Sequence, residues 1–421
     1  MAAISSPTSV SDICLAAKAA ARGLAATGSA VKDAALLAMA SALEARTAEI
    51  LEANARDLEA GRESGLSDAL MDRLALDERR VAAMAAGVRE IVALPDPVGE
   101  VLDGFRLPNG LDVRKVRVPL GVVAVIYEAR PNVTIDAAAL ALKSGNAVVL
   151  RGSSSAAHSN DILARVAIEA VEAAGLPAGS LSLVAGGGRD ELAELAGQEG
   201  VVDLIIPRGG EGLKKALSAV AKVPVIYAAS GNCHVFVDAS ADLERAEAIV
   251  VNAKTQRPGV CNAAETLLVH EAVAAAFLPR VLGSLRAAGV ELRGDASVRA
   301  IDGAVAVATE EDWAEEYLAL VLAVRVVGSA EEAIEHVNAY GSGHSEAILT
   351  RDTASARAFQ LGVDAACVYV NASTRFTDGG QFGMGAEIGN STQKLHARGP
   401  IGARELCTFK YLVEGDGQIR P

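Results

Sequence analysis

The sequence predicts an α/β protein with two parallel sheets and a separate β hairpin. From Gly121 onward, continuous apolar runs alternate with amphipathic stretches, which is typical of parallel strands covered by helices on both faces. The chain has 421 residues, more than one compact core usually holds, so two or three domains are expected. Aromatic residues make up only 3% of the chain, so the cores must consist largely of Ala, Val, Leu and Ile.

Each part of the chain carries its own periodicity. Residues 11–93 predict helices, because apolar positions in 31–60 recur near helical spacing with charges between them. Residues 104–121 predict a hairpin, since alternating segments flank a turn at Pro108-Asn109-Gly110. In the first α/β unit, strands are predicted at 122–127, 147–150, 181–184, 202–206 and 223–227, and helices at 135–143, 161–174, 190–196 and 213–220. In the second unit, strands are predicted at 235–237, 266–269, 322–327, 346–349 and 367–370.

Charge and composition disfavour several classes of partner. The formal net charge of −14 disfavours nucleic-acid binding, although a locally basic pocket can still hold a small anion. No apolar run approaches the ~20 residues of a membrane span, and residues 1–12 lack the pattern of a secretory signal. The histidines and cysteines show no metal-ligand spacing, and five cysteines without a CxxC pair argue against a disulfide framework. We therefore expect a cytoplasmic protein with no metal, membrane or nucleic-acid partner.

Cys261 is the first candidate for chemistry. It follows a Pro-Gly turn and directly precedes an apolar strand, in the stretch Arg257-Pro-Gly-Val-Cys-Asn262. A cysteine thiol ordinarily has a pKa of about 8.5, and the preceding positive charges of Lys254 and Arg257 would favour the thiolate. The alternative is a buried core cysteine, because cysteines outside disulfides are commonly buried.

Two glycine-rich loops suggest phosphate binding. Residues 184–188 and 206–212 each follow a predicted strand and precede a predicted helix. Glycine lets the backbone approach a phosphate, and a helix N-terminus presents N–H groups to it. Neither loop has the G-x-G-x-x-G pattern, and glycines at such junctions are also common turn residues.

Four stretches of the chain together form a recognisable pattern. They are Tyr127-Glu-Ala-Arg-Pro-Asn-Val-Thr134, Arg257-Pro-Gly-Val-Cys-Asn262, Ala333-Ile-Glu-His-Val-Asn-Ala-Tyr-Gly-Ser-Gly-His-Ser-Glu-Ala-Ile348, and Phe382-Gly-Met-Gly-Ala-Glu-Ile-Gly389 with Lys394-Leu-His-Ala-Arg-Gly-Pro400. The order of segments resembles the aldehyde dehydrogenase superfamily over nearly the whole chain. More narrowly, the four stretches are similar to the γ-glutamyl phosphate reductase family, the glutamate-5-semialdehyde dehydrogenases.

The resemblance implies an aldehyde dehydrogenase-like fold with three functional parts. Residues 1–103 and 122–233 would form a Rossmann-type cofactor domain, and 234–384 a second α/β domain that carries the cysteine nucleophile. Residues 104–121 and 385–421 would form a small β oligomerisation element, so a homo-oligomer is expected. The cofactor sheet of the family is an atypical five-stranded Rossmann sheet, which accounts for the missing glycine fingerprint.

The resemblance also implies a reaction. The family reduces L-glutamyl 5-phosphate to L-glutamate 5-semialdehyde and phosphate with NADPH, through a cysteine thioester, in the second step of proline biosynthesis from glutamate. A transient contact with glutamate 5-kinase would protect the labile acyl phosphate. The sequence itself does not decide between NADPH and NADH.

Residue roles follow from the matching positions. Cys261 matches the nucleophile, and Asn132 is the candidate oxyanion donor, with a turn residue as the alternative. The expected cofactor contacts are Arg151 and Ser153 at the 2′-phosphate, Pro207, Arg208, Gly209 and Gly210 at the pyrophosphate, and Glu316 at the nicotinamide ribose. The expected substrate contacts are Arg130, Arg257 and Arg375, because arginine suits both a carboxylate and a phosphate. The alternatives are a strand-end charge for Arg151, a solvated helix face for Glu316 and surface charges for the three arginines.

One departure from the superfamily pattern bears on the reaction. Hydrolytic aldehyde dehydrogenases carry a Glu-Leu-Gly-Gly motif whose glutamate activates water, whereas this chain has Ala228-Ala-Ser-Gly231 at that place. Alanine cannot act as a base, and a reductase that exchanges its acyl group with phosphate benefits from excluding water. Two other hypotheses stay open: a hydrolytic NAD-dependent dehydrogenase, and a binding or scaffolding protein without activity.

Overall fold

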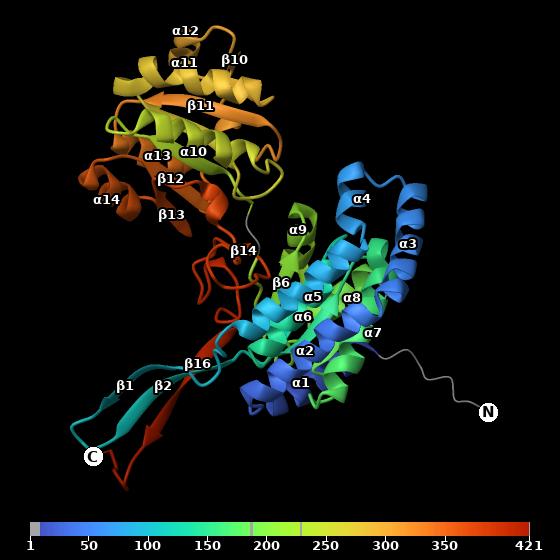
Figure 1. Ribbon diagram of the computed structural model, residues 1–421. Helices are drawn as coiled ribbons and strands as arrows, with labels where there is room; N and C mark the ends of the chain where they lie inside the picture. Colours follow the sequence, from blue (N-terminus) through green and yellow to red (C-terminus); the bar gives the residue numbers. More distant parts are fainter. Residues whose placement is uncertain (1–8, 186–187, 228–229, 421) are drawn as a thin grey trace. The chain divides into compact units, whose positions relative to one another are not determined.

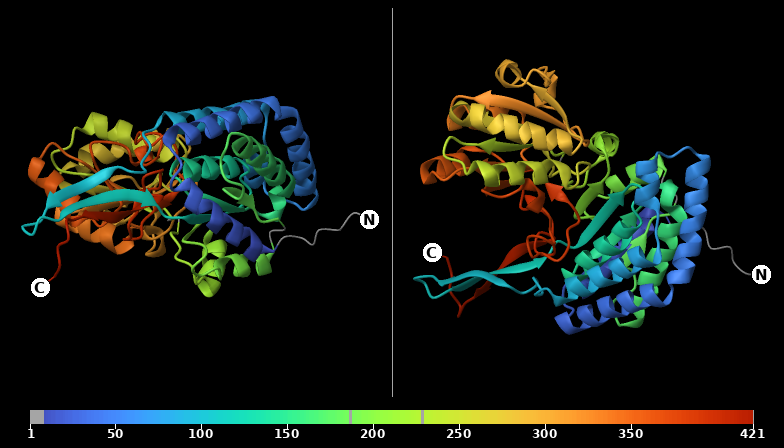
Figure 2. Two further views of the ribbon diagram at one scale, coloured as in Figure 1. Left: turned by 90° about the horizontal axis from the view of Figure 1, so that it is seen from below. Right: turned by 45° about the horizontal axis from the view of Figure 1, so that its top comes forward.

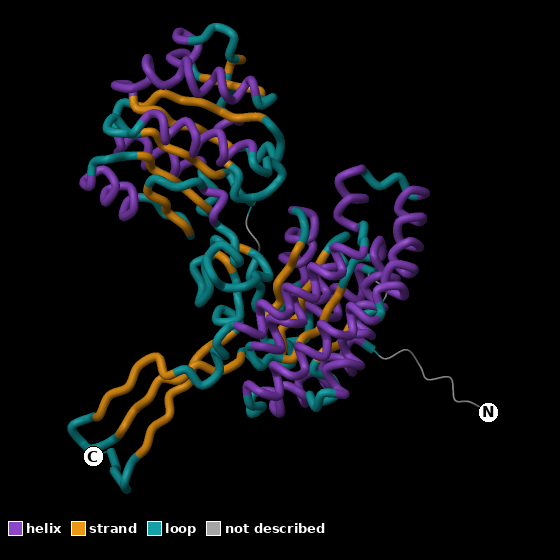
Figure 3. Tube along the Cα trace, viewed as in Figure 1, coloured by secondary structure: helices purple, strands orange, loops and turns teal. Residues whose placement is uncertain are grey.

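A computed structural model describes residues 9–185, 188–227 and 230–420 of the chain. The chain forms two compact units (Figures 1 and 3). Unit 1 comprises Met1–Ala228, Gly383–Gly389 and Ile401–Pro421, and unit 2 comprises Ala229–Phe382 and Asn390–Pro400. Each unit contains its own parallel sheet with helices packed against it, so the predicted α/β class is confirmed.

Unit 1 begins with helices, as predicted. They are α1 (Val10–Leu24), α2 (Ser29–Ala45), α3 (Thr47–Glu63), α4 (Asp68–Leu74) and α5 (Glu78–Ala93). The periodic stretch 31–60 is divided at Arg46, which ends α2 and precedes α3. Asp77 begins α5 by accepting a hydrogen bond from the Arg80 N–H, which satisfies one of the unpaired N–H groups of the first turn.

The sheet of unit 1 has the strand order β5-β4-β3-β6, and all its pairs are parallel. Its strands are β3 (Val122–Tyr127), β4 (Ala147–Arg151), β5 (Leu181–Leu183) and β6 (Leu204–Arg208). The helices between and after them are α6 (Asn132–Lys143), α7 (Ala157–Ala173), α8 (Arg189–Ala196) and α9 (Glu211–Val220), with a short 3-10 helix η1 (Ser154–Ala156). Every residue of β3 and β4 is buried, which explains the continuous apolar runs. The predicted strand at 223–227 appears as one parallel bridge between Val225 and Ile205.

A separate antiparallel sheet in unit 1 has the order β1-β2-β16. It comprises β1 (Val101–Arg106), β2 (Asp112–Pro119) and β16 (Cys407–Glu414). The predicted hairpin is confirmed, and Gly110 supplies the positive φ of +90° that its turn requires. The pairing of β16 with β2 runs from Cys407 opposite Pro119 to Glu414 opposite Asp112, so the C-terminal strand completes the sheet (Figure 1).

The sheet of unit 2 has seven strands in the order β10-β9-β11-β8-β7-β12-β13, all parallel. The strands are β7 (Cys233–Val237), β8 (Ala264–His270), β9 (Glu291–Gly294), β10 (Ala306–Val307), β11 (Val321–Val327), β12 (Ser345–Leu349) and β13 (Cys367–Val370). The helices are α10 (Leu243–Thr255), α11 (Glu271–Ala287), α12 (Ala296–Ile301), α13 (Ala330–Tyr340) and α14 (Thr353–Gly362). Two 3-10 helices, η2 (Glu311–Trp313) and η3 (Thr374–Phe376), and the strand pair β14 (Asn390–Ser391) and β15 (Gly399–Pro400) complete the unit.

Successive residues of the strands in unit 2 pack into two separate hydrophobic cores. Val235 and Val237 of β7 belong to a cluster with α10, α11 and α12, whereas Phe236 belongs to a second cluster with α13 and α14. This follows from the two-residue period of a strand, which directs successive side chains to opposite faces. Figure 2 shows helices along both faces of this sheet. The sheet is therefore apolar on both sides, and its strand ends are the places left for polar function.

Among the described residues, no helix combines the length and apolar character needed to cross a membrane. All five cysteines lie in the described part of the chain, and none of them forms a disulfide. Four are buried, and Cys261 is half-buried.

Phe277→Ala should lower the free energy of unfolding by about 3–5 kcal/mol, because Phe277 is fully buried in the core formed by α10, α11 and the strands. Urea denaturation followed by circular dichroism would measure this change. The matched control is Leu361→Ala, since Leu361 of α14 is 76% exposed and its truncation should change stability by no more than about 0.5 kcal/mol. Equal destabilisation by the two variants would contradict the assigned core.

Candidate active site

Cys261 lies in the loop that joins α10 to β8, in unit 2. The next residue fixes this loop to η3: the Asn262 Nδ2 donates to the Thr377 carbonyl at 2.8 Å, and the Thr374 hydroxyl donates to the Asn262 carbonyl at 2.7 Å. Asn262 and Thr374 are buried, whereas the Cys261 side chain is half-buried. The backbone beside the cysteine is therefore held by two hydrogen bonds, while Cys261 itself is only partly buried.

Gly231 packs directly against the backbone of Cys261. A Cβ atom at position 231 would lie 1.5 Å from the Cys261 carbonyl oxygen and 2.5 Å from its Cα, so no side chain fits. The same carbonyl oxygen accepts a hydrogen bond from the Cys233 thiol, with a sulfur–oxygen distance of 3.1 Å. The segment that begins β7 thus determines where the cysteine loop lies.

Glu316 lies in a loop after η2, so the prediction that it belongs to a helix is wrong. Its Oε1 accepts a hydrogen bond from the Gly231 N–H at 2.6 Å. Burial raises the pKa of the Glu316 carboxyl, and the hydrogen bond from Gly231 opposes that shift. Gly231 therefore connects two of the predicted functional residues of unit 2, since it packs on Cys261 and donates to Glu316.

Arg257 and Arg375 lie close enough to interact with each other and with the cysteine. The Arg375 Nε donates to the Gln256 side-chain oxygen at 2.9 Å, which places this guanidinium beside the start of the Cys261 loop. Burial and the charge of Arg257 lower the pKa of Arg375, and the charge of Cys261 opposes that effect. Two like charges at one loop attract an anion, and here the anion can be a thiolate or a substrate group.

Lys254 does not take the position that the sequence suggested. Its side chain is fully buried, and its Nζ lies 2.5 Å from the Glu265 Oε2, which is also fully buried. Burial lowers the pKa of the Lys254 ammonium and raises the pKa of the Glu265 carboxyl, while each charge favours the ionised form of the other. The positive charge of Lys254 is therefore paired with Glu265, and not with Cys261 as the sequence suggested.

In unit 1, Arg151 and Ser153 lie where β4 ends. The Arg151 Nη2 donates to the Gly188 carbonyl at 2.6 Å, and its Nε is buried without a hydrogen-bond partner among the described residues. The Ser153 hydroxyl accepts a hydrogen bond from the Ala129 N–H at 3.2 Å. A buried guanidinium N–H without a partner among the described residues is suited to binding an anionic group.

Pro207 and Arg208 end β6, and Gly209 and Gly210 lead into α9. The Gly210 N–H donates to the Glu128 carboxylate at 3.0 Å, and a Cβ at Gly209 would lie 2.7 Å from that carboxylate. The N-terminus of α9 thus already binds one anionic group, as a helix N-terminus is expected to do. Glu128 was not recognised as part of this loop, because 82 residues separate it from Gly210.

Asn132 is the first residue of α6 in unit 1, and its side chain is exposed. Its Nδ2 donates one hydrogen bond to the Asp136 carboxylate at 2.9 Å, and burial raises the pKa of Asp136 to about 6. An amide nitrogen carries two hydrogens, and only one of them has a partner among the described residues. Arg130 is half-buried in the preceding loop, where Ala129 has a positive φ of 27°. A non-glycine residue in that conformation indicates a tightly constrained turn.

Two histidines near the site, His234 and His344, are buried. The His234 Nδ1 pairs with the Glu346 carboxylate, and the His344 Nδ1 pairs with the Ser345 hydroxyl. Ala228 and Ala229 of the substituted Glu-Leu-Gly-Gly position lie outside the described residues, as do Gly186 and Gly187 of the first glycine loop.

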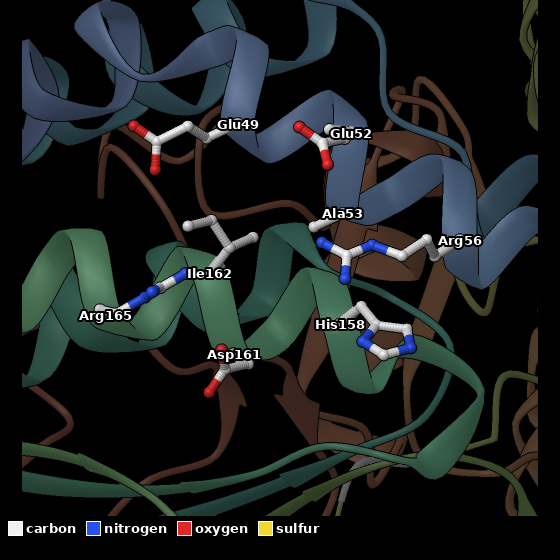
Figure 4. A pocket seen from close by; sticks show the side chains of 8 residues that line it. All are labelled: Glu49, Glu52, Ala53, Arg56, His158, Asp161, Ile162 and Arg165. Atoms are coloured by element: carbon white, nitrogen blue, oxygen red, sulfur yellow. The ribbon is translucent and has the colours of Figure 1, made fainter.

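A polar pocket lies between α3 and α7 of unit 1 (Figure 4). Its lining combines both signs of charge, and none of the predicted site residues contributes to it. The lining residues are Glu49, Glu52, Ala53, Arg56, His158, Asp161, Ile162 and Arg165. Glu49 is already paired with Arg46 at 2.8 Å, so part of its charge is used within the helix.

Comparison with known proteins identifies the family of this chain. The model of the aldehyde dehydrogenase family matches residues 2–302 and 303–397. This chain belongs to the aldehyde dehydrogenase family. The γ-glutamyl phosphate reductases of Moorella thermoacetica and Thermobifida fusca are 59% and 57% identical to this family member, over 96% and 92% of its chain and 97% and 93% of theirs. The crystal structure of γ-glutamyl phosphate reductase from Thermotoga maritima is 47% identical, has a TM-score of 0.96 and covers 98% of this chain and 100% of its own.

These similarities confirm the resemblance on which the residue roles were predicted. This chain is therefore an oxidoreductase of the γ-glutamyl phosphate reductase group. Its aldehyde dehydrogenase-like fold is likewise confirmed. The individual site residues remain predictions, and each can be tested by substitution.

Gly231→Ala should lower the turnover of aldehyde oxidation by about 10²-fold, since a methyl group at this position must displace the Cys261 backbone and misplace its thiol. Steady-state kinetics would measure the loss, and circular dichroism would confirm that the variant is folded. The matched control is Gly283→Ala in α11, where a Cβ would meet nothing within 4 Å and activity should be unchanged. Wild-type turnover in Gly231→Ala would contradict the close packing.

Proposed function

We propose that this chain reduces L-glutamyl 5-phosphate to L-glutamate 5-semialdehyde and phosphate with NADPH, in the cytoplasm, as a step of proline biosynthesis from glutamate. The observation that carries the proposal is a partly exposed cysteine with two arginines close enough to interact with it, in a chain that matches γ-glutamyl phosphate reductases over nearly its whole length. The cysteine provides the nucleophile, and the arginines provide positive charge in a protein whose net charge is −14.

In this proposal, the Cys261 thiolate attacks the acyl carbonyl carbon of the substrate. The rigid loop held by Asn262 keeps the sulfur in position, so little entropy is lost during the attack. The oxyanion would be stabilised by backbone N–H groups and the Asn132 amide. The carbon–oxygen bond to phosphate then breaks, phosphate leaves, and a thioester remains on Cys261.

The proposed role of Arg257 and Arg375 is to bind the two anionic ends of the substrate, with Arg130 as a third contact. Arg375 is half-buried and Arg257 is exposed, and their mutual repulsion is relieved when an anion binds between them. The planar guanidinium group suits both a carboxylate and a phosphate dianion. A phosphate leaving group would therefore depart from a positively charged surface.

The residues of unit 1 fit a phosphorylated dinucleotide. Arg151 would offer a buried N–H that has no partner among the described residues, and Ser153 a hydroxyl, to the 2′-phosphate, and the backbone from Pro207 to Gly210 would hold the pyrophosphate. Glu316 of unit 2 would hold the nicotinamide ribose. When bound, NADPH supplies the hydride that reduces the thioester. The resulting Cys261 thiohemiacetal collapses, and its carbon–sulfur bond breaks to release the semialdehyde and the thiolate.

The proposal also assigns a role to each part of the chain. Residues 1–103 and 122–233 would bind the cofactor, and 234–384 would carry the nucleophile. The β1-β2-β16 sheet, within the segments 104–121 and 385–421, would assemble a homo-oligomer. This assignment is supported by the exposed apolar and aromatic side chains on that sheet, which are Val101, Phe105, Phe409, Tyr411 and Val413. A transient contact with glutamate 5-kinase would fit the lability of an acyl phosphate.

Cys261→Ser should lower single-turnover reduction of L-glutamyl 5-phosphate by about 10³-fold or more, because the hydroxyl is a much weaker nucleophile than a thiolate. Binding of NADPH, followed by its fluorescence, should be retained. Cys14→Ala is the matched control, since Cys14 is buried in α1 and should not affect turnover. Wild-type activity in Cys261→Ser would refute the nucleophile assignment.

Oxidation of L-glutamate 5-semialdehyde with NADP should require inorganic phosphate, because phosphate is the proposed acceptor of the acyl group and no glutamate occupies position 228. Initial rates with and without phosphate, each with NADP and with NAD, would measure the requirement and the cofactor preference. Phosphate-independent formation of glutamate would instead support a hydrolytic dehydrogenase. Absence of both NADPH binding and Cys261 alkylation would support a scaffolding protein.

A further inference from the structure

The Cys261 loop is spanned by a buried ion pair that the proposed chemistry does not use. Lys254 lies in the last turn of α10, immediately before the loop, and Glu265 is the second residue of β8, immediately after it. The distance between Lys254 Nζ and Glu265 Oε2 is 2.5 Å, and both side chains have 0% exposure. The pair thus joins the two ends of the segment that carries the cysteine.

Glu265 also contacts the segment that carries Glu316. Its second carboxylate oxygen, Oε1, accepts a hydrogen bond from the Leu318 N–H at 3.3 Å. Leu318 has a positive φ of 52°, a conformation that a leucine adopts only when its surroundings constrain it. A Cβ at Gly259 would lie 3.7 Å from the Leu318 carbonyl oxygen, so this segment also lies along the Cys261 loop.

These contacts close into a ring within unit 2. Glu265 holds Leu318, and two residues earlier Glu316 accepts the hydrogen bond from Gly231. Gly231 in turn packs on the carbonyl oxygen of Cys261, at the centre of the loop whose ends Lys254 and Glu265 join. Each link is either a direct contact or a short run of backbone, so a change at Glu265 can reach both Cys261 and Glu316 without leaving the ring.

We propose that Lys254 and Glu265 are positioning residues that fix the Cys261 loop and the Glu316 segment relative to each other. A buried ion pair is poor evidence for added stability, since apolar residues of similar volume are often as stable. An apolar pair, however, could not accept a hydrogen bond from the Leu318 N–H. The Glu265 carboxylate does so, and the Lys254 ammonium group holds that carboxylate in place. The inference rests on the proposed function in that it takes Cys261 and Glu316 as the groups being positioned.

The test compares two doubly substituted proteins. Lys254→Met with Glu265→Leu removes both the charge pair and the acceptor, whereas Lys254→Met with Glu265→Gln removes the charges but keeps an oxygen that can accept from Leu318. We expect the Leu protein to exchange its Leu318 amide hydrogen about tenfold faster, as loss of a backbone hydrogen bond implies, and the Gln protein to exchange near the wild-type rate. The matched control is Lys32→Met with Asp96→Leu, which removes another buried lysine pair, in unit 1.

Two more measurements separate positioning from stability. The rate constant for alkylation of Cys261 by iodoacetamide should differ from the wild-type value at least about threefold in the Leu protein. It should equal the wild-type value in the Gln protein and in the control. The KM for NADPH should rise more than kcat falls, since Glu316 is the displaced group. If the Leu protein is folded and shows wild-type exchange and alkylation, the inference is overturned. If all doubly substituted proteins change alike, the effect is one of stability alone, and the inference is again overturned.

A third variant covers the case in which the Leu protein does not fold. Lys254→Met alone leaves the buried Glu265 carboxylate without its counter-charge, whereas the neutral amide introduced by Glu265→Gln needs none, so exchange at Leu318 should rise about threefold above that of the Gln protein, and an unchanged rate would overturn the role of the pair. Hydrogen exchange and alkylation need no acyl phosphate substrate. They therefore give the same answer whether or not Cys261→Ser abolishes reduction, and the two proposals can fail separately.

Discussion

The close approach of Gly231 to the carbonyl group of Cys261 determines the geometry of the loops of unit 2 that carry Cys261 and Glu316. Any side chain at position 231 would overlap that carbonyl, so the approach depends on a hydrogen atom in place of a Cβ. The same glycine donates its N–H to Glu316, which ties a second loop to the cysteine. Loops at strand ends are ordinarily the most variable part of an α/β protein, and here two of them are held by backbone contacts.

The packing of the sheets explains why the polar groups gather at strand ends. In unit 2 both faces of the sheet are covered by apolar cores, and in unit 1 β3 and β4 are buried throughout. Arg151 ends β4, and Arg208 ends β6. The carboxyl ends of parallel strands meet at one edge of a sheet, so the topology itself collects these side chains there.

The sequence predicted those elements that depend on local pattern. Strand β13 has the predicted limits of 367–370, and β3 those of 122–127, because buried parallel strands are continuous apolar runs bounded by polar residues. The division between α2 and α3 was missed, since the apolar period continues across Arg46 although the backbone does not. Glu316 was placed in a helix because its neighbours are acidic and helix-compatible, yet a tertiary hydrogen bond to Gly231 holds it in a loop.

Long-range contacts mark the limit of that reasoning. The pairing of β16 with β2 joins Cys407 to Pro119, and the carboxylate of Glu128 reaches the N-terminus of α9 across 82 residues. Neither contact produces a periodic pattern in the sequence from which it could be predicted. The ion pair of Lys254 and Glu265 is closer, 11 residues apart, but two charged residues beside a loop are ordinarily solvated, so sequence alone favours the wrong environment.

The cysteines show how environment, and not residue type, separates structural from chemical roles. Burial raises the pKa of Cys14 to about 11 and that of Cys407 to about 12, so both remain thiols at neutral pH. Burial also raises the pKa of Cys233 well above its usual range, and this protonated thiol is what donates to the Cys261 carbonyl. A thiolate at position 233 could not donate, so the geometry of the Cys261 loop depends on its neighbour staying protonated. The half-buried cysteine thus owes part of its placement to a fully buried one.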